Sequence, residues 1–491
     1  METLSQLALK AAQACPEKIA VKDQDRHFTY QQFADRTLAL SSYFHSQGIQ
    51  KGDRVAVLMK NRAEHIELDI ALAHSGIIKV PLNYRLHPKE LLYMIDDASV
   101  SLVIGDQDLL DSVEVQVPKL AVGASYEAIL EHHQGQKHLE KVEEDDLFAI
   151  MYTSGTTGNP KGVMLSHRNM IAGALSLAQV CNVDYDDIVG HVAPLTHGSN
   201  FLSHVSWLYG LTQVVYDKFE AAHFLDKLQE DQVSIIFMVP TMVNLMIQDA
   251  AFDATKLSTL KSINMAGSPI AAAKLQFALE KAGTIFVETY GQVEAPMCIT
   301  MMPRHELPNR LESCGRIGPF VDVKIIDDAG EEVPHGEVGE IVCKGSLVMK
   351  GYWNNEKATQ DTLKDGWLHT GDLAWRDGQG YVHIVDRKKD VIISGGVNIY
   401  PREVEEVLNL HPGVKETCVI GVEDEKWGEN VIAYVVPNGM QEVTEEHLLS
   451  LCKEHLASFK KPKEVYIVTE LPKSSYGKIL KRELKTQHVG V

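Results

Sequence analysis

Thr153-Ser154-Gly155-Thr156-Thr157-Gly158-Asn159-Pro160-Lys161-Gly162 (TSGTTGNPKG) is a glycine-rich run of ten residues. It holds three glycines, four small hydroxyl residues, one proline and one lysine. Glycine tolerates φ > 0 and lets the backbone approach a ligand, and successive N–H groups in such a turn form an anion-binding concavity. Lys161 adds a positive charge with three hydrogen-bond donors. The run therefore suits a polyphosphate.

The residues on either side of this run predict the two strands of a hairpin. Residues 148–152 (FAIMY) are a short apolar run of strand type, and residues 163–165 are interpreted as the returning strand. The run is not a Walker A loop, because that motif places Ser or Thr after its lysine and opens a helix. Here Gly162 follows Lys161. On composition alone, a flexible surface turn is the alternative interpretation.

The bulk composition predicts a multidomain globular protein. A chain of 491 residues corresponds to two to four domains at about 150 residues each. Hydrophobic residues make up 45% and charged residues 23%, as in ordinary globular proteins. The net charge of −20 argues against broad binding to nucleic acid or an anionic membrane. This net charge does not exclude nucleotide binding, which needs only a local basic site. The lysine-rich segment 460–485 is interpreted either as such a phosphate-binding site or as a solvated tail.

The seven cysteines are scattered and include no C-x-x-C pair. This pattern fits free thiols in a reducing compartment, not a disulfide framework or a zinc site. The N-terminal segment lacks the basic and apolar regions of a signal peptide. No apolar stretch reaches the roughly 18 to 20 residues that span a bilayer. We therefore expect a cytoplasmic protein without integral membrane association.

The first half of the chain alternates helix and strand signals. Residues 29–32 form a capping-box pattern ahead of an apolar-periodic helix, and Gly76 ends a second helix at 62–75. This rhythm predicts an α/β fold with parallel sheets covered by helices. Strands are predicted at 54–59, 102–105, 234–239 and 262–266.

The pattern changes twice in the second half. Charged turn signals with short strands predict a β-rich subdomain at about 315–385, and a small α+β unit follows from Asp386. We therefore predict a large N-terminal domain at 1–385 and a small C-terminal domain at 386–491. The strands of the subdomain are expected at 321–326, 339–343 and 381–385, and the C-terminal helices and strands at 403–410, 417–422, 431–436 and 445–456.

The run at 153–162 resembles the phosphate loop of the adenylate-forming (AMP-binding) superfamily. This superfamily contains acyl- and aryl-CoA synthetases, firefly-type luciferases and the adenylation domains of peptide synthetases. Further segments resemble its other motifs in their usual order and cover nearly the whole chain. They are PLTHGS (194–199), AGSP (266–269), TYGQVE (289–294), WLHTGDL (367–373), DRKKDVIISGG (386–396) and PKSSYGKI (472–479).

The resemblance implies an ATP site with a magnesium ion. It assigns Glu294, together with Thr153, to Mg²⁺, a hard cation that prefers oxygen ligands and substrate phosphates. Asp372 matches the carboxylate that takes both ribose hydroxyls, and Gly267-Ser268 matches the turn that carries adenine. The residues expected at ATP or AMP are Thr153, Ser154, Gly155, Thr156, Thr157, Lys161, Gly267, Ser268, Tyr290, Gly291, Gln292, Val293, Asp372 and Arg387.

Val293 departs from the superfamily pattern, which usually has threonine there. The threonine hydroxyl contacts the α-phosphate, and valine keeps the branched shape without the polar group. A hydrogen bond to a charged group contributes roughly 1.5–3 kcal/mol. A backbone N–H remains at the position, so the departure bears on catalytic efficiency more than on nucleotide binding.

The resemblance also implies catalytic and acceptor residues. Lys478 matches the catalytic lysine of the small domain, and Asp386 matches the hinge about which that domain turns. His197 matches the residue beside the reacting carboxylate, and Gly395-Gly396 would let the backbone pass close to the pantetheine arm of coenzyme A. Alone, a lysine in a basic tail or a loop histidine would be an ordinary surface residue.

Superfamily analogy places the acid pocket among mostly apolar, flexible side chains that suit an alkyl or aryl tail. The string HGSNF at 197–201 contains no acid to bind an amino group, which argues against an amino-acid substrate. The chain is also too short for the insertion that distinguishes fatty acyl-AMP ligases. The expected pocket residues are His197, Asn200, Phe201, Val239, Met242, Met265 and Met297.

These observations favour an AMP-forming carboxylic acid–CoA ligase that uses ATP, Mg²⁺ and coenzyme A. The enzyme would activate a fatty or aryl carboxylate as the acyl-adenylate and pass the acyl group to CoA. Three alternatives stay open: loading of a carrier-protein thiol, a luciferase-like oxidation, and nucleotide binding without catalysis. The sequence does not identify the acid or the oligomeric state, and a homodimer is left open.

Overall fold

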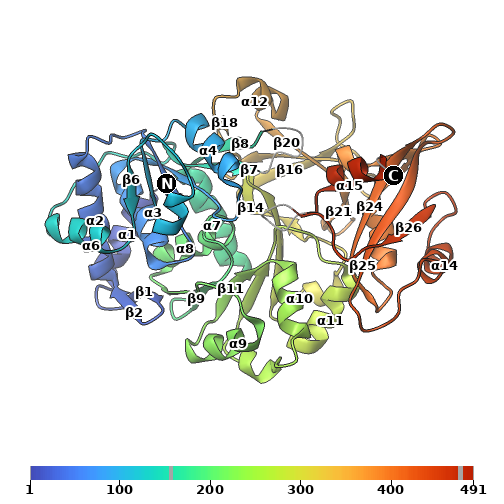
Figure 1. Cartoon of the computed structure of the whole chain (residues 1–491), viewed down its shortest axis with the longest axis horizontal. Helices are drawn as coiled ribbons and strands as arrows, with labels where there is room; N and C mark the ends of the chain where they lie inside the picture. The colour runs from blue at the N-terminus through green and yellow to red at the C-terminus, as the bar shows by residue number, and fades with distance from the viewer. Residues whose placement is uncertain (1, 154–158, 474–478, 490–491) are drawn as a thin grey trace.

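The computed structural model describes residues 2–153, 159–473 and 479–489. The elements up to β21 form one large body, and the C-terminal sheet with its helices lies on one side of it (Figure 1). The fold is mixed α/β with a large N-terminal part and a smaller C-terminal part, as the sequence predicts. In the part of the chain that the structure describes, no helix is both long and apolar enough to cross a bilayer.

A seven-stranded sheet organises the N-terminal third. Its order is β18-β8-β7-β4-β3-β5-β6, and the strands from β7 to β6 run parallel. The predicted strands at 54–59 and 102–105 are β3 and β5. The bounds are β3 Arg54–Leu58, β4 Ile78–Pro81, β5 Leu102–Gly105, β6 Lys119–Ala121, β7 Leu147–Thr153, β8 Lys161–Ser166 and β18 Gly351–Tyr352.

Strand β3 shows why this sheet is covered on both faces. Val55 and Val57 pack into one core cluster with helices α2 (Tyr30–Ser46) and α3 (Ala63–Ser75). Ala56 and Leu58 pack into another with helix α4 (Pro88–Asp97). Side chains alternate between the faces of a strand, so a nearly continuous apolar run is the signature of a sheet buried on both sides.

A nine-stranded sheet forms the second layer. Its order is β15-β14-β13-β12-β11-β9-β10-β1-β2, with parallel pairing from β13 to β1. The bounds are β1 Ile19–Asp23, β2 Arg26–Thr29, β9 Ile188–His191, β10 Thr212–Val215, β11 Ile235–Met238, β12 Ser262–Met265, β13 Phe286–Gln292, β14 Ala295–Met302 and β15 Arg316–Ile317.

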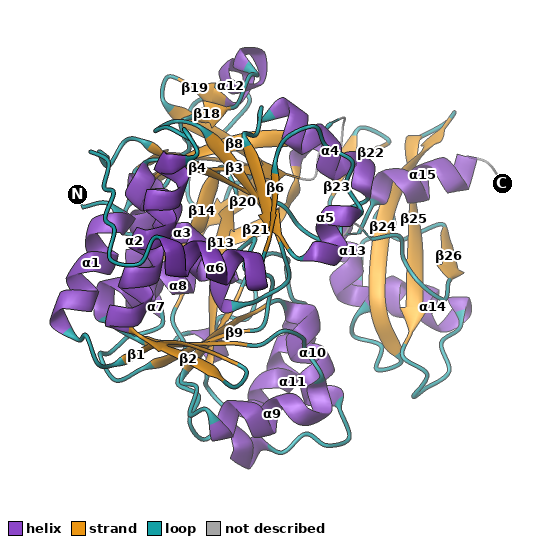
Figure 2. Cartoon of the chain, turned by 60° about the vertical axis from the view of Figure 1, so that its left-hand side comes forward, coloured by secondary structure: helices purple, strands orange, loops and turns teal. Residues whose placement is uncertain are grey.

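Helices α3 and α7 lie between the two large sheets, since each contacts strands of both, and α8 packs against α7 and the nine-stranded sheet. Figure 2 shows α9, α10 and α11 grouped on the outer side of the nine-stranded sheet. The helices of this part are α1 Leu4–Ala14, α2 Tyr30–Ser46, α3 Ala63–Ser75, α4 Pro88–Asp97, α5 Gln107–Asp111, α6 Ala124–His132, α7 His167–Val180, α8 Ser199–Tyr209, α9 Ala221–Glu230, α10 Pro240–Gln248 and α11 Ala272–Ala282.

The predicted ends of α2 and α3 are confirmed. Thr29 caps α2 and makes the reciprocal capping-box bonds with Gln32. Gly76 ends α3 in a left-handed conformation at φ 62°, which glycine adopts without the penalty of a Cβ.

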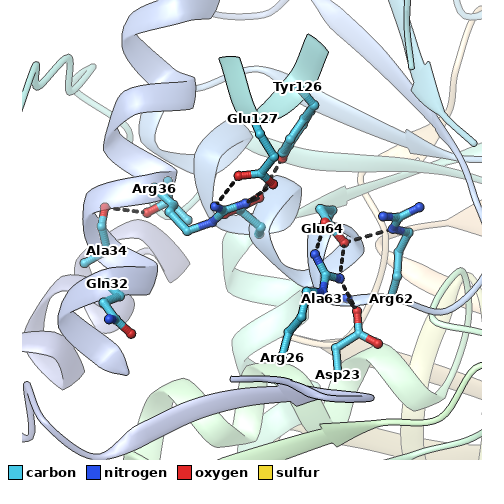
Figure 3. Close-up of polar contacts among 12 residues, drawn as sticks. Asp23, Arg26, Gln32, Ala34, Arg36, Arg62, Ala63, Glu64, Tyr126 and Glu127 are labelled. Atoms are coloured by element: carbon cyan, nitrogen blue, oxygen red, sulfur yellow. Dashed lines mark hydrogen bonds and ion pairs between the residues drawn. The ribbon is translucent and has the colours of Figure 1, made fainter. Parts of the chain in front are cut away.

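Helix α3 is buried along its whole length although it carries three carboxylates. Glu64 accepts hydrogen bonds from Arg26 at 2.7 Å and Arg62 at 2.8 Å, and Glu67 pairs with Arg36 at 2.5 Å. Figure 3 shows the two arginines converging on Glu64 and Arg36 reaching across to Glu127. Buried charges need such partners, so these pairs fix α3 between its neighbours.

The remaining strands form two five-stranded antiparallel-rich sheets. The predicted strand at 381–385 is β21, which extends to Arg387 and includes Asp386. The bounds are β16 Val321–Ile326, β17 Gly339–Gly345, β19 Leu363–Lys364, β20 Trp367–Arg376 and β21 Val382–Arg387, then β22 Ile392–Ser394, β23 Val397–Ile399, β24 Val414–Asp424, β25 Gly428–Pro437 and β26 Glu464–Ile467, with helices α12 Glu356–Thr362, α13 Pro401–Leu408, α14 Glu445–His455 and α15 Lys481–Val489.

Candidate active site

The glycine-rich run connects β7 and β8, as the sequence predicts. The two strands pair antiparallel, with Thr153 opposite Lys161. A Cβ at Gly162 would lie 2.7 Å from the Ile150 side chain and 3.1 Å from the Tyr152 ring, so this position of the hairpin requires glycine. Four of the expected ATP-binding residues, Ser154, Gly155, Thr156 and Thr157, lie outside the described residues.

Tyr352 joins the lysine of this hairpin to the carboxylate expected to hold magnesium. The Lys161 ammonium lies 4.8 Å from the centroid of the Tyr352 ring, and the Tyr352 hydroxyl donates to Glu294 Oε1 at 2.8 Å. Burial, together with the charge of Glu294, raises the pKa of Tyr352, so the phenol stays a donor. Tyr352 was not among the expected site residues, because its place depends on the pairing of β18 with β8.

The segment 289–294 forms the end of a hairpin between β13 and β14, and Val293 and Glu294 make its turn. A Cβ at Gly291 would meet the Met297 backbone nitrogen at 2.6 Å, and Met297 itself has φ 68°. A non-glycine residue in that region is strained, and such strain is concentrated at functional sites. Val293 is half-buried and packs against the main hydrophobic core.

The expected ribose residues form a compact polar group around Asp372, which is 5% exposed. Oδ2 of this carboxylate accepts from the Tyr290 hydroxyl at 2.6 Å and from Gln292 Nε2 at 2.7 Å. Oδ1 lies 3.3 Å from Arg387 Nε, since Asp372 and Arg387 are opposite each other on β20 and β21. The structure thus brings two residues of β13 together with two residues of the consecutive strands β20 and β21.

The turn at Ala266-Gly267-Ser268-Pro269 follows β12 and precedes α11. Gly267 has φ 92°, and Gly267 and Ser268 are exposed. The predicted strand-to-helix turn is therefore present, with its backbone accessible.

Only part of the expected acid pocket lies around one cavity. His197, Asn200 and Phe201 line it together with Lys79, Phe148 and Met151, and His197 Nδ1 lies 2.9 Å from Thr196 Oγ1. The other expected pocket residues do not line it: Val239, Met242 and Met297 belong to or pack against the main core, and Met265 lies in the core beside the nine-stranded sheet. Lys79 was not expected there.

The expected C-terminal residues lie on β21 and on the β22–β23 turn. The Asp386 carboxylate accepts from the backbone N–H of Arg387 at 2.7 Å and of Arg402, in the first turn of α13, at 2.9 Å. Gly395 and Gly396 have φ of 59° and 80°, and the Gly395 N–H donates to the Trp427 carbonyl at 2.7 Å. Lys478 lies outside the described residues.

The residues present fit a magnesium ion held mainly by ATP. Mg²⁺ usually keeps one or two carboxylates and completes its shell with phosphates and water, and Glu294 on the hairpin turn supplies one carboxylate. Across residues 2–153, 159–473 and 479–489, no group of three or more His, Cys, Asp and Glu side chains could hold a metal ion.

Comparison with known proteins gives matches along nearly the whole chain. Residues 9–353 match the family described as AMP-binding enzyme, and residues 403–478 match the AMP-binding enzyme C-terminal domain. The chain is 35% identical to a feruloyl-CoA synthase of Amycolatopsis sp, covering 97% of both sequences. It superposes on ATP-bound MatB from Rhodopseudomonas palustris with a TM-score of 0.92 at 30% identity, covering 99% of both chains. A further match is the O-succinylbenzoate coenzyme A synthetase of Bacillus subtilis in complex with ATP and a magnesium ion, with a TM-score of 0.86 at 30% identity, covering 98% of this chain and 99% of that one.

Proposed function

This chain belongs to the AMP-binding enzyme family and is an AMP-forming acid–CoA ligase that uses ATP, Mg²⁺ and CoA, and we propose that its adenylation site lies between Glu294 and Asp372. The observation that carries this placement is that two groups of polar side chains meet at the turn of the hairpin formed by β13 and β14. One group consists of Tyr352, Glu294 and Lys161. The other consists of Asp372 and its partners Tyr290, Gln292 and Arg387.

In the first half-reaction, an oxygen of the acid attacks the α-phosphorus of ATP, and the bond to pyrophosphate breaks. The protein supplies positioning and charge stabilisation for such a transfer. Lys161 and the 153–162 run hold the departing phosphates, and Asp372 and Arg387 hold the ribose. Magnesium, when bound, would neutralise phosphate charge, and Glu294 and Thr153 are the residues that we propose would hold it.

Asp372 already has partners at both oxygens: two hydrogen bonds at Oδ2 and the Arg387 guanidinium beside Oδ1. A carboxylate oxygen accepts more than one hydrogen bond, so ribose hydroxyls add to or replace the contacts from Tyr290 and Gln292. We assign these two side chains to fixing the orientation of the carboxylate before the nucleotide arrives.

In the second half-reaction, the CoA sulfur attacks the acyl carbon, and the bond to AMP breaks. We propose that the small domain begins at Asp386 and turns about it, withdrawing Lys478 and presenting Gly395-Gly396 to the pantetheine arm. The position of Asp386 supports this hinge, because its carboxylate accepts one hydrogen bond within β21 and one from α13, and so lies where the last strand of the large domain meets the first helix of the small one. His197 is assigned to orienting the acid at the entrance of its pocket.

We also propose a cytoplasmic location. All seven cysteines are free thiols, and burial raises the pKa of several of them, including Cys181 to about 12. Thiols of this kind are typical of proteins from a reducing compartment.

The test of the function measures AMP release from ATP and Mg²⁺ with a panel of carboxylic acids, with and without CoA. CoA-dependent release supports the ligase, and release only with a carrier protein supports the carrier-loading alternative. Nucleotide binding without turnover across the panel would contradict both.

The role of Lys478 is tested by separating the two half-reactions. We expect Lys478→Ala to abolish adenylation and to leave thioester formation from supplied acyl-adenylate nearly intact. An equal loss of both half-reactions would contradict the assignment.

A further inference from the structure

The cavity beside His197 ends on a buried ion pair that the adenylation chemistry does not use. Asp69 in α3 and Lys79 in β4 form this pair, and their exposed fractions are 0% and 1%. Lys79 also lines the cavity. It occupies the face of β4 opposite to that of Ile78 and Val80, which pack with α4.

Two helices supply the partners of this pair. His65 Nδ1, one turn from Asp69 on α3, lies 3.2 Å from the Lys79 ammonium. Asn200 Nδ2 on α8 donates to Asp69 Oδ2 at 2.6 Å, and His204 Nε2, one turn further, lies 3.7 Å from the same oxygen. Residues four apart share a face of a helix, so α3 and α8 direct these side chains toward each other, and those of α3 also meet Lys79 of β4.

The group carries one positive and one negative charge. Burial by itself would raise the pKa of Asp69, but the adjacent Lys79 ammonium lowers it well below its usual range. Burial and the same ammonium lower the pKa of His65 to about 3, so this imidazole is neutral. Asp69 therefore already neutralises the charge of Lys79, and a ligand that contacts this lysine need not be an anion.

Lys79 and Asn200 both line the cavity, and each has a polar group with unused hydrogen-bonding capacity. An ammonium has three donors, and within the described part of the chain Lys79 has two side-chain acceptors, Asp69 and His65. The amide nitrogen of Asn200 faces Asp69, and among the described residues its Oδ1 has no partner although the side chain is 93% buried. Buried polar atoms of this kind are normally satisfied.

The free donor and the free acceptor together define the complementary ligand group. A ligand that ends in an alkyl group forms a hydrogen bond with neither Lys79 nor Asn200. A ligand that ends in a carboxylate can accept from Lys79 but has no proton to donate to Asn200 Oδ1. A hydroxyl accepts from Lys79 and donates to Asn200, so it satisfies both.

We propose that Lys79 and Asn200 select a carboxylic acid that carries a hydroxyl group at the end away from the reacting carboxylate, an inference that rests on the proposed ligase function. Phe148 and Phe201 also line the cavity and supply apolar contacts for the body of the acid. Met151 and Met170 also line it, and their unbranched side chains can rotate to admit the body of the acid.

The experiment compares matched acids by their kcat/KM for CoA-dependent AMP release. The pairs are benzoic and 4-hydroxybenzoic acid, and hexanoic and 6-hydroxyhexanoic acid, with terephthalic and adipic acid as the carboxylate-ended probes. We expect the hydroxylated member of at least one pair to be preferred by about 10- to 150-fold, the worth of a hydrogen bond to a charged group. Equal use of both members of each pair, or preference for the diacids, would overturn the proposal.

Two variants locate the preference. Lys79→Met combined with Asp69→Asn removes both charges together, because removing one would leave a lone buried charge. Asn200→Leu removes the unpartnered acceptor at similar volume. In each variant, the ratio of kcat/KM between the hydroxylated acid and its matched partner should fall close to one. Glu67→Gln, on the same helix but paired with Arg36 away from the cavity, is the matched control and should keep it.

The outcomes separate this inference from the ligase function. A preference that persists in both variants, or that Glu67→Gln loses equally, refutes the selection by Lys79 and Asn200 while turnover stands. Absence of CoA-dependent AMP release with every acid refutes the function itself, and the inference fails with it.

Discussion

Replacing Tyr352 by phenylalanine isolates one hydrogen bond at the proposed metal carboxylate. The substitution removes the donor that lies 2.8 Å from Glu294 Oε1. It keeps the ring over which the Lys161 ammonium lies at 4.8 Å. Volume and the apolar contacts of the ring are unchanged, so the effect reports on the hydroxyl.

The expected loss follows from the charge of the acceptor. A hydrogen bond to a charged group contributes about 1.5–3 kcal/mol, which corresponds to about 10- to 150-fold in rate. Glu294 is half-buried and not sealed from water, so we expect the lower end of this range, about tenfold in kcat/KM for MgATP. Tyr352→Leu should lose more, since the cation–π contact contributes about 0.5–2 kcal/mol.

The assay is pyrophosphate–ATP exchange, which reports adenylation alone, beside thioester formation from supplied acyl-adenylate. Tyr352→Phe should slow the exchange and leave thioester formation unchanged, and its melting temperature should stay close to that of the parent protein. Unchanged exchange, or equal slowing of both half-reactions, would refute a role in holding Glu294 for the metal.

Three further perturbations test separate parts of the molecule. Val293→Thr restores a hydroxyl at the hairpin turn and should raise the exchange rate by up to about 10- to 150-fold; an unchanged rate would show that the hydroxyl is dispensable. Asp372→Asn should weaken ATP binding measured by calorimetry by about tenfold or more, because the amide cannot accept from Tyr290, Arg387 and ribose together; unchanged affinity would argue against the ribose site. Burial would raise the pKa of Glu64, but hydrogen bonds from Arg26 and Arg62 lower it from 4.5 to about 2, so the stability it contributes is present above pH 4.5 and is lost as the pH falls toward 2. Glu64→Gln should flatten that part of the stability curve measured by urea unfolding, and an unaltered curve would contradict the pairing.

Local signals in the sequence predicted the elements well because their causes are local. The capping box at Thr29 and the glycine at position 76 fix helix ends through bonds within a few residues. The apolar run of β3 indicated a strand covered on both faces, and its alternating side chains do pack into two different hydrophobic cores. The motif strings likewise placed Asp372, Arg387 and Tyr290 in one site, and the structure brings them together.

The sequence did not predict Tyr352 or Lys79. Tyr352 reaches Glu294 only because β18 pairs with β8 at the far edge of its sheet. Lys79 stands in an apolar strand sequence, where a lone lysine carries no signal of its partner. Two of the expected pocket residues, Met265 and Met297, do not line the cavity beside His197; they lie in hydrophobic cores whose positions depend on the packing of the two sheets.

The sequence by itself therefore determined the class of fold, the order of its elements and the nucleotide chemistry, since short motifs carry their own turns, donors and charges. Only the tertiary structure decided which side chains from distant elements meet. It placed Tyr352 between Lys161 and Glu294, and it placed Lys79 against Asp69 and Asn200. A buried charge or hydrogen-bond donor needs a partner nearby in the folded protein. The order of strands in the sheets, not distance along the sequence, decides which element supplies that partner.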